Sequence, residues 1–119
     1  YAPYGPLSTG SPHPRGYGSF PRLLGHYVRD TRSLTLEAAI HKVTWMPARK
    51  LQIEDRGVLR IGAYADVVAF DPDTVADRAS FDDPHQYPVG IPHVVVNGAL
   101  TLRDGEHTGL LDGRGVTPG

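Results

Sequence analysis

Two arginines in a stretch rich in proline and glycine are the side chains best suited to bind an anion. They are Arg15 and Arg22, and the stretch runs from Ser11 to Tyr27, SPHPRGYGSFPRLLGHY. A guanidinium group can hold a carboxylate through two parallel hydrogen bonds. The alternative is a salt bridge or an exposed side chain, and Arg22, which lies nearer the next predicted helix, is the weaker candidate. The prolines and glycines argue against a helix or a central strand, so we expect a loop.

Histidine could contribute chemistry as a metal ligand. The chain contains six histidines, yet no two stand at the His-x-His spacing or at the i, i+4 spacing of a zinc-binding helix. A structural zinc site takes about four clustered ligands. We therefore expect loop or surface histidines at all six positions: His13, His26, His41, His85, His93 and His107.

Several aspartates occupy positions where a carboxylate could act in catalysis or hold a cation. Asp66 precedes an apolar run, and we favour a carboxylate that pairs with nearby backbone N–H groups over a catalytic one. Asp71, Asp73 and Asp77 have a loosely calcium-like spacing. That segment lacks the glycine and the final glutamate of an EF-hand loop, so it is better interpreted as a turn.

Helices are predicted in the N-terminal half of the chain. Residues 1–22 are expected to be irregular and Leu23–Arg29 to form a short helix. The clearest helix covers Thr35–Trp45, with Thr35 as its N-cap. Its apolar residues recur at the spacing of one buried helical face: Leu36, Ala39, Ile40 and Val43. Pro47 would end this helix and begin another short one.

Strands are predicted in the C-terminal half. Val67–Phe70 is typical of a strand buried on both faces. A long proline-containing loop should follow, from about residue 72 to residue 91. Asn97-Gly98 then separates two apolar runs, which is the strongest short-range signal of a β-hairpin. So small a sheet needs something to pack against or pair with, and we infer part of a composite domain.

Composition excludes some classes of partner. The 119 residues carry a formal net charge of −1, without the basic face of a nucleic-acid-binding protein. No apolar run approaches the roughly 18 residues of a membrane span. The chain has no cysteine, and hence no disulfide or thiolate. We expect a cytoplasmic protein that binds neither nucleic acid nor membrane.

Several motifs taken together resemble the amidohydrolase superfamily. The shared ones are GVLRIGAYADVVAFD from Gly57 to Asp71, LTLEA from Leu34, and the Thr44-x-x-Pro47-Ala48-Arg49 pattern. Narrower ones are similar to the C-terminal portion of N-acyl-D-amino-acid deacylases, the D-aminoacylases. These are PHPR at Pro12, GSFPR at Gly18, the run from Asp71 to Gly98, and DGEHTG at Asp104. Three residues depart from the family pattern: Gln52 stands where the family usually has glycine, Trp45 where a smaller residue is common, and Ile61 where proline is common.

The resemblance implies a bipartite α+β fold. Residues 1–50 would be the last loop and the closing helices of a catalytic (β/α)8 barrel. Residues 51–119 would supply the C-terminal strands of a small β-sandwich domain built from both chain ends. The partners of this chain would then be the rest of the barrel and the N-terminal β-strands.

The resemblance also implies a zinc-dependent hydrolase that cleaves N-acyl-D-amino acids into a D-amino acid and a carboxylate. Zinc would lower the pKa of a bound water so that hydroxide attacks the acyl carbonyl, and an aspartate would move the proton. The family's metal ligands and that aspartate have no counterpart here, so we expect a fragment that lacks metal ligands and is inactive by itself. Because the loop would follow the strand that carries the aspartate, we expect Arg15 to bind the substrate α-carboxylate and His13 to shape the loop.

Two alternatives remain open at this stage. One is a non-catalytic β-rich binding or assembly module, which should fold without further chain. The other is an amidohydrolase with a different amide substrate, such as a cyclic amide.

Overall fold

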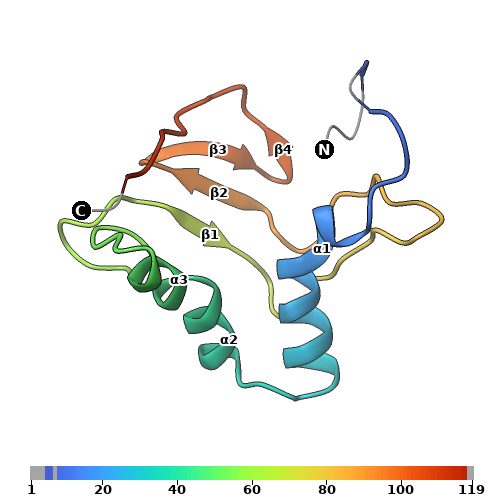
Figure 1. Ribbon diagram of the computed structural model, residues 1–119, viewed down its shortest axis with the longest axis horizontal. Coiled ribbons are helices and arrows are strands. Elements are labelled where there is room, and N and C mark those ends of the chain that lie inside the picture. The colour runs from blue at the N-terminus through green and yellow to red at the C-terminus, as the bar shows by residue number, and fades with distance from the viewer. Residues whose placement is uncertain (1–4, 7, 118–119) are drawn as a thin grey trace. The chain divides into compact units, whose positions relative to one another are not determined.

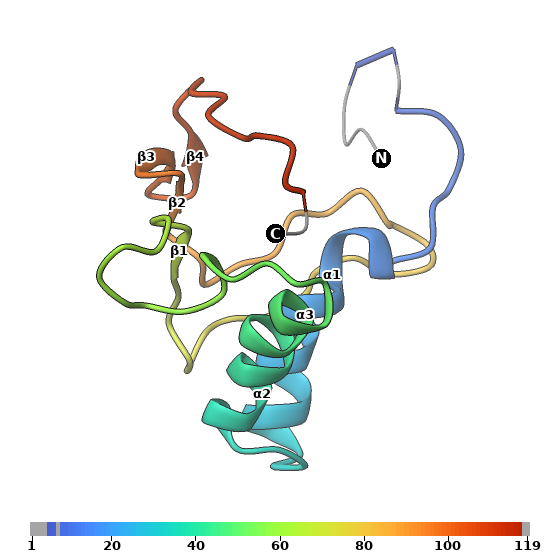
Figure 2. The same cartoon turned by 60° about the vertical axis from the view of Figure 1, so that its left-hand side comes forward.

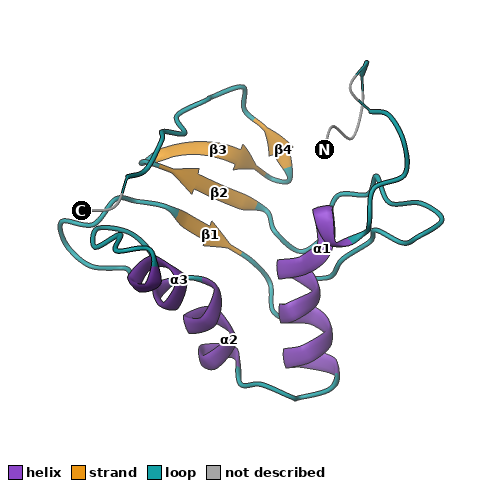
Figure 3. Ribbon diagram, viewed as in Figure 1, coloured by secondary structure: helices purple, strands orange, loops and turns teal. Residues whose placement is uncertain are grey.

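The computed structural model describes residues 5–6 and 8–117 of the chain. Helices come first in sequence and an antiparallel sheet comes last, which confirms the predicted order of elements (Figure 3). None of the helices in this described part is long and apolar enough to span a membrane.

The chain forms two compact units, and each unit is assembled from two separate stretches of sequence. The first unit contains the residues up to Leu34 together with Asp71–Gly90. The second contains Thr35–Phe70 together with the residues from Ile91 onward. The predicted boundary between residues 50 and 51 concerns the domains of a longer protein and stays a prediction.

In the first unit, residues 15–22 were predicted to be irregular but form a helix, so that prediction was wrong, whereas the predicted short helix at Leu23–Arg29 is confirmed. Helix α1 (Arg15–Arg22) continues without a break into the π-helix η1 (Leu23–Asp30) (Figure 1). Pro14 precedes α1 with a φ of −51°, which is already helical, so this proline favours the start of the helix. Pro21 lies inside α1. Because it has no N–H to donate, it disturbs the regular ladder just before the wider turns of η1.

Glycines in these helices allow a distant segment to approach closely. A Cβ atom at Gly25 would lie 2.5 Å from the carbonyl oxygen of Val75, and one at Gly18 would lie 2.8 Å from Cβ of Asp77. Glycine lowers helix propensity by about 1 kcal/mol relative to alanine. Here each glycine also permits a close contact with the segment Asp71–Gly90 that a residue with a Cβ atom could not make. Glycine content therefore indicated a loop where the chain is helical.

The segment Asp71–Gly90 contains no helix and only one isolated β-bridge, between Ala76 and Val89. This agrees with the predicted long loop. Val75 has an exposed fraction of 0% and is the largest fully buried side chain among the described residues. Its backbone N–H donates to the carbonyl of Asp71 at 2.9 Å. The segment is therefore a packed part of the first unit despite its lack of regular structure.

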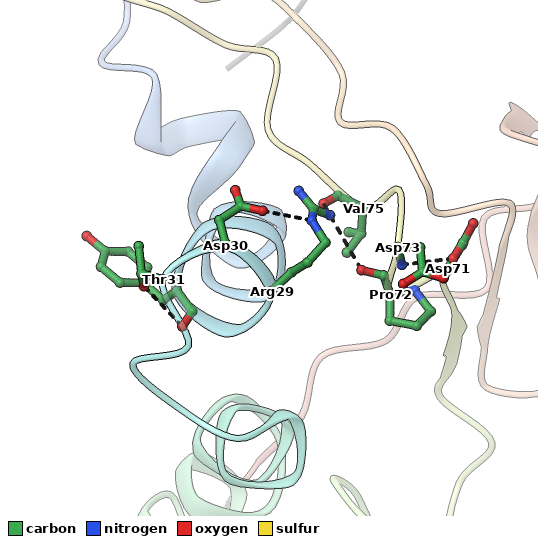
Figure 4. A network of polar contacts seen from close by, with 8 residues as sticks. Arg29, Asp30, Thr31, Asp71, Pro72, Asp73 and Val75 are labelled. Atoms are coloured by element: carbon green, nitrogen blue, oxygen red, sulfur yellow. Dashed lines mark hydrogen bonds and ion pairs between the residues drawn. The ribbon is translucent and has the colours of Figure 1, made fainter.

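Arg29 of η1 fixes the start of this segment. Its guanidinium donates to the backbone carbonyl of Val75 at 2.7 Å and to that of Pro72 at 3.4 Å (Figure 4). It also pairs with the neighbouring Asp30 at 2.9 Å. Satisfied carbonyls matter here because an unpaired buried acceptor would cost about 1–3 kcal/mol.

In the second unit, both predicted helices are present, but the break between them lies earlier than predicted. Helix α2 (Leu36–Val43) begins at the predicted N-cap, where the Thr35 hydroxyl accepts a hydrogen bond from the N–H of Ala38 at 3.2 Å. Helix α3 (Trp45–Lys50) follows after Thr44 and contains Pro47 in its first turn (Figure 2). The break thus comes slightly earlier than Pro47. On the predicted apolar face only Ala39 is fully buried, and its other members are partly covered.

Four antiparallel strands form a sheet in the order β1-β2-β3-β4. The strands are β1 (Val67–Ala69), β2 (His93–Val96), β3 (Ala99–Arg103) and β4 (Glu106–His107). The predicted hairpin joins β2 to β3, and both turn residues have positive φ, 49° at Asn97 and 88° at Gly98. Such values suit the right-handed twist of paired strands. A second turn of the same kind, at Asp104 and Gly105, leads into β4.

The prediction that Val67–Phe70 is buried on both faces was wrong. β1 pairs only with β2, and the side chain of Val68 is 53% exposed. Apolar side chains elsewhere in the second unit are also strongly exposed, among them Leu59, Ile61 and Leu111. An apolar run predicts that a strand will be covered, but here no element of the described unit supplies the cover.

Candidate functional site

Arg15 is the first residue of α1, where the chain turns from an extended stretch into the helix. The residue is exposed, and among the described residues its guanidinium makes no hydrogen bond or ion pair. Its backbone carbonyl accepts from the Ser19 hydroxyl at 2.9 Å. The backbone of Arg15 is therefore fixed within the helix while its charged group is available to a ligand.

His13 holds the start of this helix. Its Nδ1 accepts a hydrogen bond from the backbone N–H of Arg15 at 3.1 Å. A nitrogen that accepts carries no proton, so this contact requires the tautomer protonated on Nε2. The ring of His13 also packs edge-on against Phe81, with ring centroids 5.0 Å apart. The arrangement suits the predicted role of His13 in shaping the loop, although the role itself stays a prediction.

The N-terminus of α1 has no free N–H group to offer an anion. The N–H of Gly16 donates to the carbonyl of His13 at 3.0 Å, and that of Tyr17 donates to Pro14 at 3.1 Å. The N–H of Arg15 is taken by the His13 ring. An anion at this end of α1 would consequently depend on the Arg15 guanidinium.

His85 connects Gly10, which precedes α1, with Tyr17 of α1, a role that the sequence did not predict. Its Nε2 lies 3.2 Å from the carbonyl oxygen of Gly10, and its Nδ1 lies 3.1 Å from the hydroxyl of Tyr17. Because a carbonyl can only accept, Nε2 is the donor in the first bond. Tyr17 and His85 are 68 positions apart. No local spacing could have indicated the pair.

Arg22 is engaged in an ion pair. Its guanidinium lies 3.3 Å from a carboxylate oxygen of Asp77, which itself packs against Gly18. Such a salt bridge was the alternative to anion binding that the sequence left open for Arg22, the weaker of the two candidates. The pair ties α1 to the segment Asp71–Gly90.

Asp66 takes part in a hydrogen-bond network within the second unit. Its carboxylate pairs with Arg56 and accepts from the backbone N–H of Asn97 at 2.8 Å. Arg56 also donates to the side-chain oxygen of Asn97 at 2.7 Å. Burial alone would raise the pKa of Asp66, but the hydrogen bonds from Asn97 and Arg56 outweigh it and hold the pKa below its usual value. Asp66 thus pairs with a backbone N–H group as predicted, but that group lies 31 positions away, whereas a local one was expected.

Asp71 forms the predicted turn. Its carboxylate accepts from the backbone N–H of Asp73 at 2.9 Å and from the Thr74 hydroxyl at 2.8 Å. These two hydrogen bonds lower the pKa of Asp71. Across residues 5–6 and 8–117, no three histidine, aspartate or glutamate side chains lie close enough together to hold a metal ion.

Residues 5–102 match the sequence model of the amidohydrolase family. The chain belongs to this family. The match covers most of the sequence and confirms the resemblance inferred from the motifs. Other amidohydrolases can therefore be compared with the chain directly.

Similar sequences within the family are deacylases. The chain is 59% identical over 91 residues to the N-acyl-D-glutamate deacylase of Alcaligenes xylosoxydans xylosoxydans, covering 76% of this chain and 19% of that protein. It is 44% identical to the D-aminoacylase of the same organism, covering 93% of this chain and 25% of that protein. The chain thus spans between a fifth and a quarter of the length of these relatives.

Solved amidohydrolase structures agree with the fold. A crystal structure of D-aminoacylase superposes with a TM-score of 0.82 at 48% identity, covering 84% of this chain and 21% of that one. The N-acyl-D-glutamate deacylase of Bordetella bronchiseptica superposes with a TM-score of 0.75 at 57% identity, covering 76% of this chain and 19% of that one. That structure contains zinc and a phosphonate inhibitor that mimics the tetrahedral intermediate of the reaction.

Proposed function

We propose that this chain is the C-terminal portion of a zinc-dependent N-acyl-D-amino-acid deacylase. The observation that carries the proposal is its 59% identity to an N-acyl-D-glutamate deacylase, together with its similarity to a zinc-containing structure of such an enzyme. Residues 1–50 would complete a (β/α)8 barrel and residues 51–119 would contribute strands to a small β-sandwich domain. The reaction would be hydrolysis of the amide bond of an N-acyl-D-amino acid.

The exposed apolar side chains support a composite domain. Among the described residues only Ala39 and Val75 are buried apolar side chains, while Leu59, Ile61 and Leu111 are strongly exposed. Each large apolar side chain gains about 1.5–3 kcal/mol from full burial. We propose that the rest of the barrel and the N-terminal strands of the β-domain cover these surfaces.

The metal would be held by parts of the protein outside this chain, because the described residues offer no suitable cluster. We propose that the chain alone is inactive for this reason. Its contribution to the reaction would be substrate binding. Every N-acyl-amino acid has a free α-carboxylate, and the guanidinium of Arg15, which makes no hydrogen bond or ion pair with the described residues, is suited to hold it through two parallel hydrogen bonds.

The Arg15→Lys substitution in the full-length protein tests this role. Lysine keeps the charge but loses the planar two-pronged geometry. We expect kcat/KM for N-acetyl-D-glutamate and for neutral N-acetyl-D-amino acids to fall at least about tenfold, which corresponds to about 1.4 kcal/mol. The matched control is Arg78→Lys, because Arg78 is also exposed and makes no hydrogen bond or ion pair among the described residues. An unchanged kcat/KM in Arg15→Lys would contradict the proposed role.

A further inference from the structure

The segment Asp71–Gly90, here called the clamp segment, contacts the chain on both sides of Arg15. The contacted stretch, residues 10–18, is here called the binding loop; it is extended at first and ends in the first turn of α1. On the N-terminal side, His85 bonds to the carbonyl of Gly10 at 3.2 Å. On the C-terminal side, it bonds to the Tyr17 hydroxyl at 3.1 Å. One imidazole ring therefore connects the two ends of the loop that carries Arg15.

Two further contacts support this arrangement. Phe81 of the clamp segment packs edge-on against His13, whose Nδ1 accepts from the Arg15 N–H. Gly18 lets Asp77 approach so closely that any Cβ atom would collide with it. The clamp segment thus touches the loop before, within and after its histidine-arginine pair.

We infer that His85 is a positioning residue for substrate binding, acting through the loop that presents Arg15. This inference rests on the proposed function and names a residue distant from the site in sequence. A long, exposed arginine side chain loses conformational freedom when it binds a ligand. A loop already held in place reduces the further ordering cost, because only the side chain still has to be fixed.

The chemistry of His85 suits this role. Its Nε2–H donates to a carbonyl that can only accept, and Nδ1 remains as a partner for the Tyr17 hydroxyl. Phenylalanine would keep an aromatic ring of similar shape and would lose both hydrogen bonds. Glutamine would keep one group able to donate and one able to accept. Comparing the two substitutions therefore distinguishes the effect of the hydrogen bonds of His85 from the effect of its size.

The experiment uses the full-length protein and two substrates. One is an N-acetyl-D-amino acid and the other is the corresponding N-acetyl-D-amino acid α-carboxamide, which keeps the N-acyl bond but has no α-carboxylate. For His85→Phe we expect KM of the acid to rise about tenfold with kcat changed by less than about twofold. The reason is that the loop carrying Arg15 is no longer held in place, whereas the reacting groups are intact. The variant should cleave the α-carboxamide with the same kcat/KM as the wild type. The ratio of kcat/KM for the acid to kcat/KM for the α-carboxamide, here called the acid preference, should therefore fall by about tenfold. His85→Gln should restore part of that preference.

The matched control is His41→Phe, the same substitution at an exposed histidine on α2 in the second unit. It should leave both substrates unaffected. If His85→Phe does not fold, Tyr17→Phe removes one end of the bridge and should also raise KM for the acid selectively. The inference is overturned if the acid preference of the folded variants equals that of the wild type, or if both substrates lose activity equally. A wild-type protein that cleaves no N-acyl-D-amino acid would instead refute the proposed function.

Discussion

Replacing Gly25 by alanine should loosen the clamp segment, and the structure gives the size of the effect. The new Cβ atom would lie 2.5 Å from the Val75 carbonyl oxygen, whereas Cβ atoms do not approach other heavy atoms to less than 3.0 Å. Accommodating an extra methyl group in a tight contact costs about 1–3 kcal/mol. Alanine recovers up to about 1 kcal/mol of helix propensity. Because the atom in the way belongs to the backbone and cannot swing aside, the cost lies in the upper part of that range, at about 2–3 kcal/mol, and the clash should prevail by about 1–2 kcal/mol.

Hydrogen exchange in the full-length protein measures this effect locally. The N–H groups of Val75, Ala76 and Val89 all donate to backbone carbonyls inside the clamp segment. A loss of about 1–2 kcal/mol should accelerate their exchange by a factor of about 5 to 30. Gly113→Ala is the matched control, because a Cβ atom there would meet nothing within 4 Å. Unchanged exchange across residues 71–90 in Gly25→Ala would refute the packing argument.

Two further predictions concern the second unit. Because the pKa of Asp66 is lower in the folded chain than its ordinary value of 3.8, its contribution to stability is present above that value and is lost as the pH falls further. Melting temperatures measured at decreasing pH should show this loss in the wild type. Asp66→Asn should be less stable than the wild type by about 1 kcal/mol near neutral pH, and its melting temperature should lack that part of the pH dependence. Gln52 has a φ of 58°, a conformation that favours glycine, so Gln52→Gly should be neutral or raise the stability by up to about 1 kcal/mol. Thermal melting measures this, and a clear loss of stability would contradict it.

Local signals in the sequence were sufficient for part of the fold. The turn at Asn97-Gly98 and the cap at Thr35 depend on residues that are adjacent or a few positions apart, and both are confirmed. Gln52, noted as a departure from a family glycine, has the positive φ for which glycine is preferred. In each case the chemistry of the residue determines the backbone directly, without help from a distant segment.

The errors came from contacts between distant parts of the chain. Glycine and proline content predicted an irregular stretch where α1 lies, because the sequence alone does not reveal that Gly18 faces the clamp segment. Val67–Phe70 was predicted to be covered on both faces, which requires neighbours that the described unit does not contain. The binding role of Arg15 could be proposed from its chemistry, whereas the bridge through His85 joins residues 68 and 75 positions apart.

The clamp segment is also constrained by its own ends. It begins two residues after the end of β1 and ends three residues before the start of β2, and these strands pair in antiparallel register with Ala69 opposite His93. The backbone N–H of Asp71 donates to the carbonyl of Gly90 at 2.9 Å, which closes the segment at its base. Strand pairing thus already holds the two ends of the segment close together. Much of the entropy cost of closing this loop is therefore met without the contacts that His85 and Phe81 make.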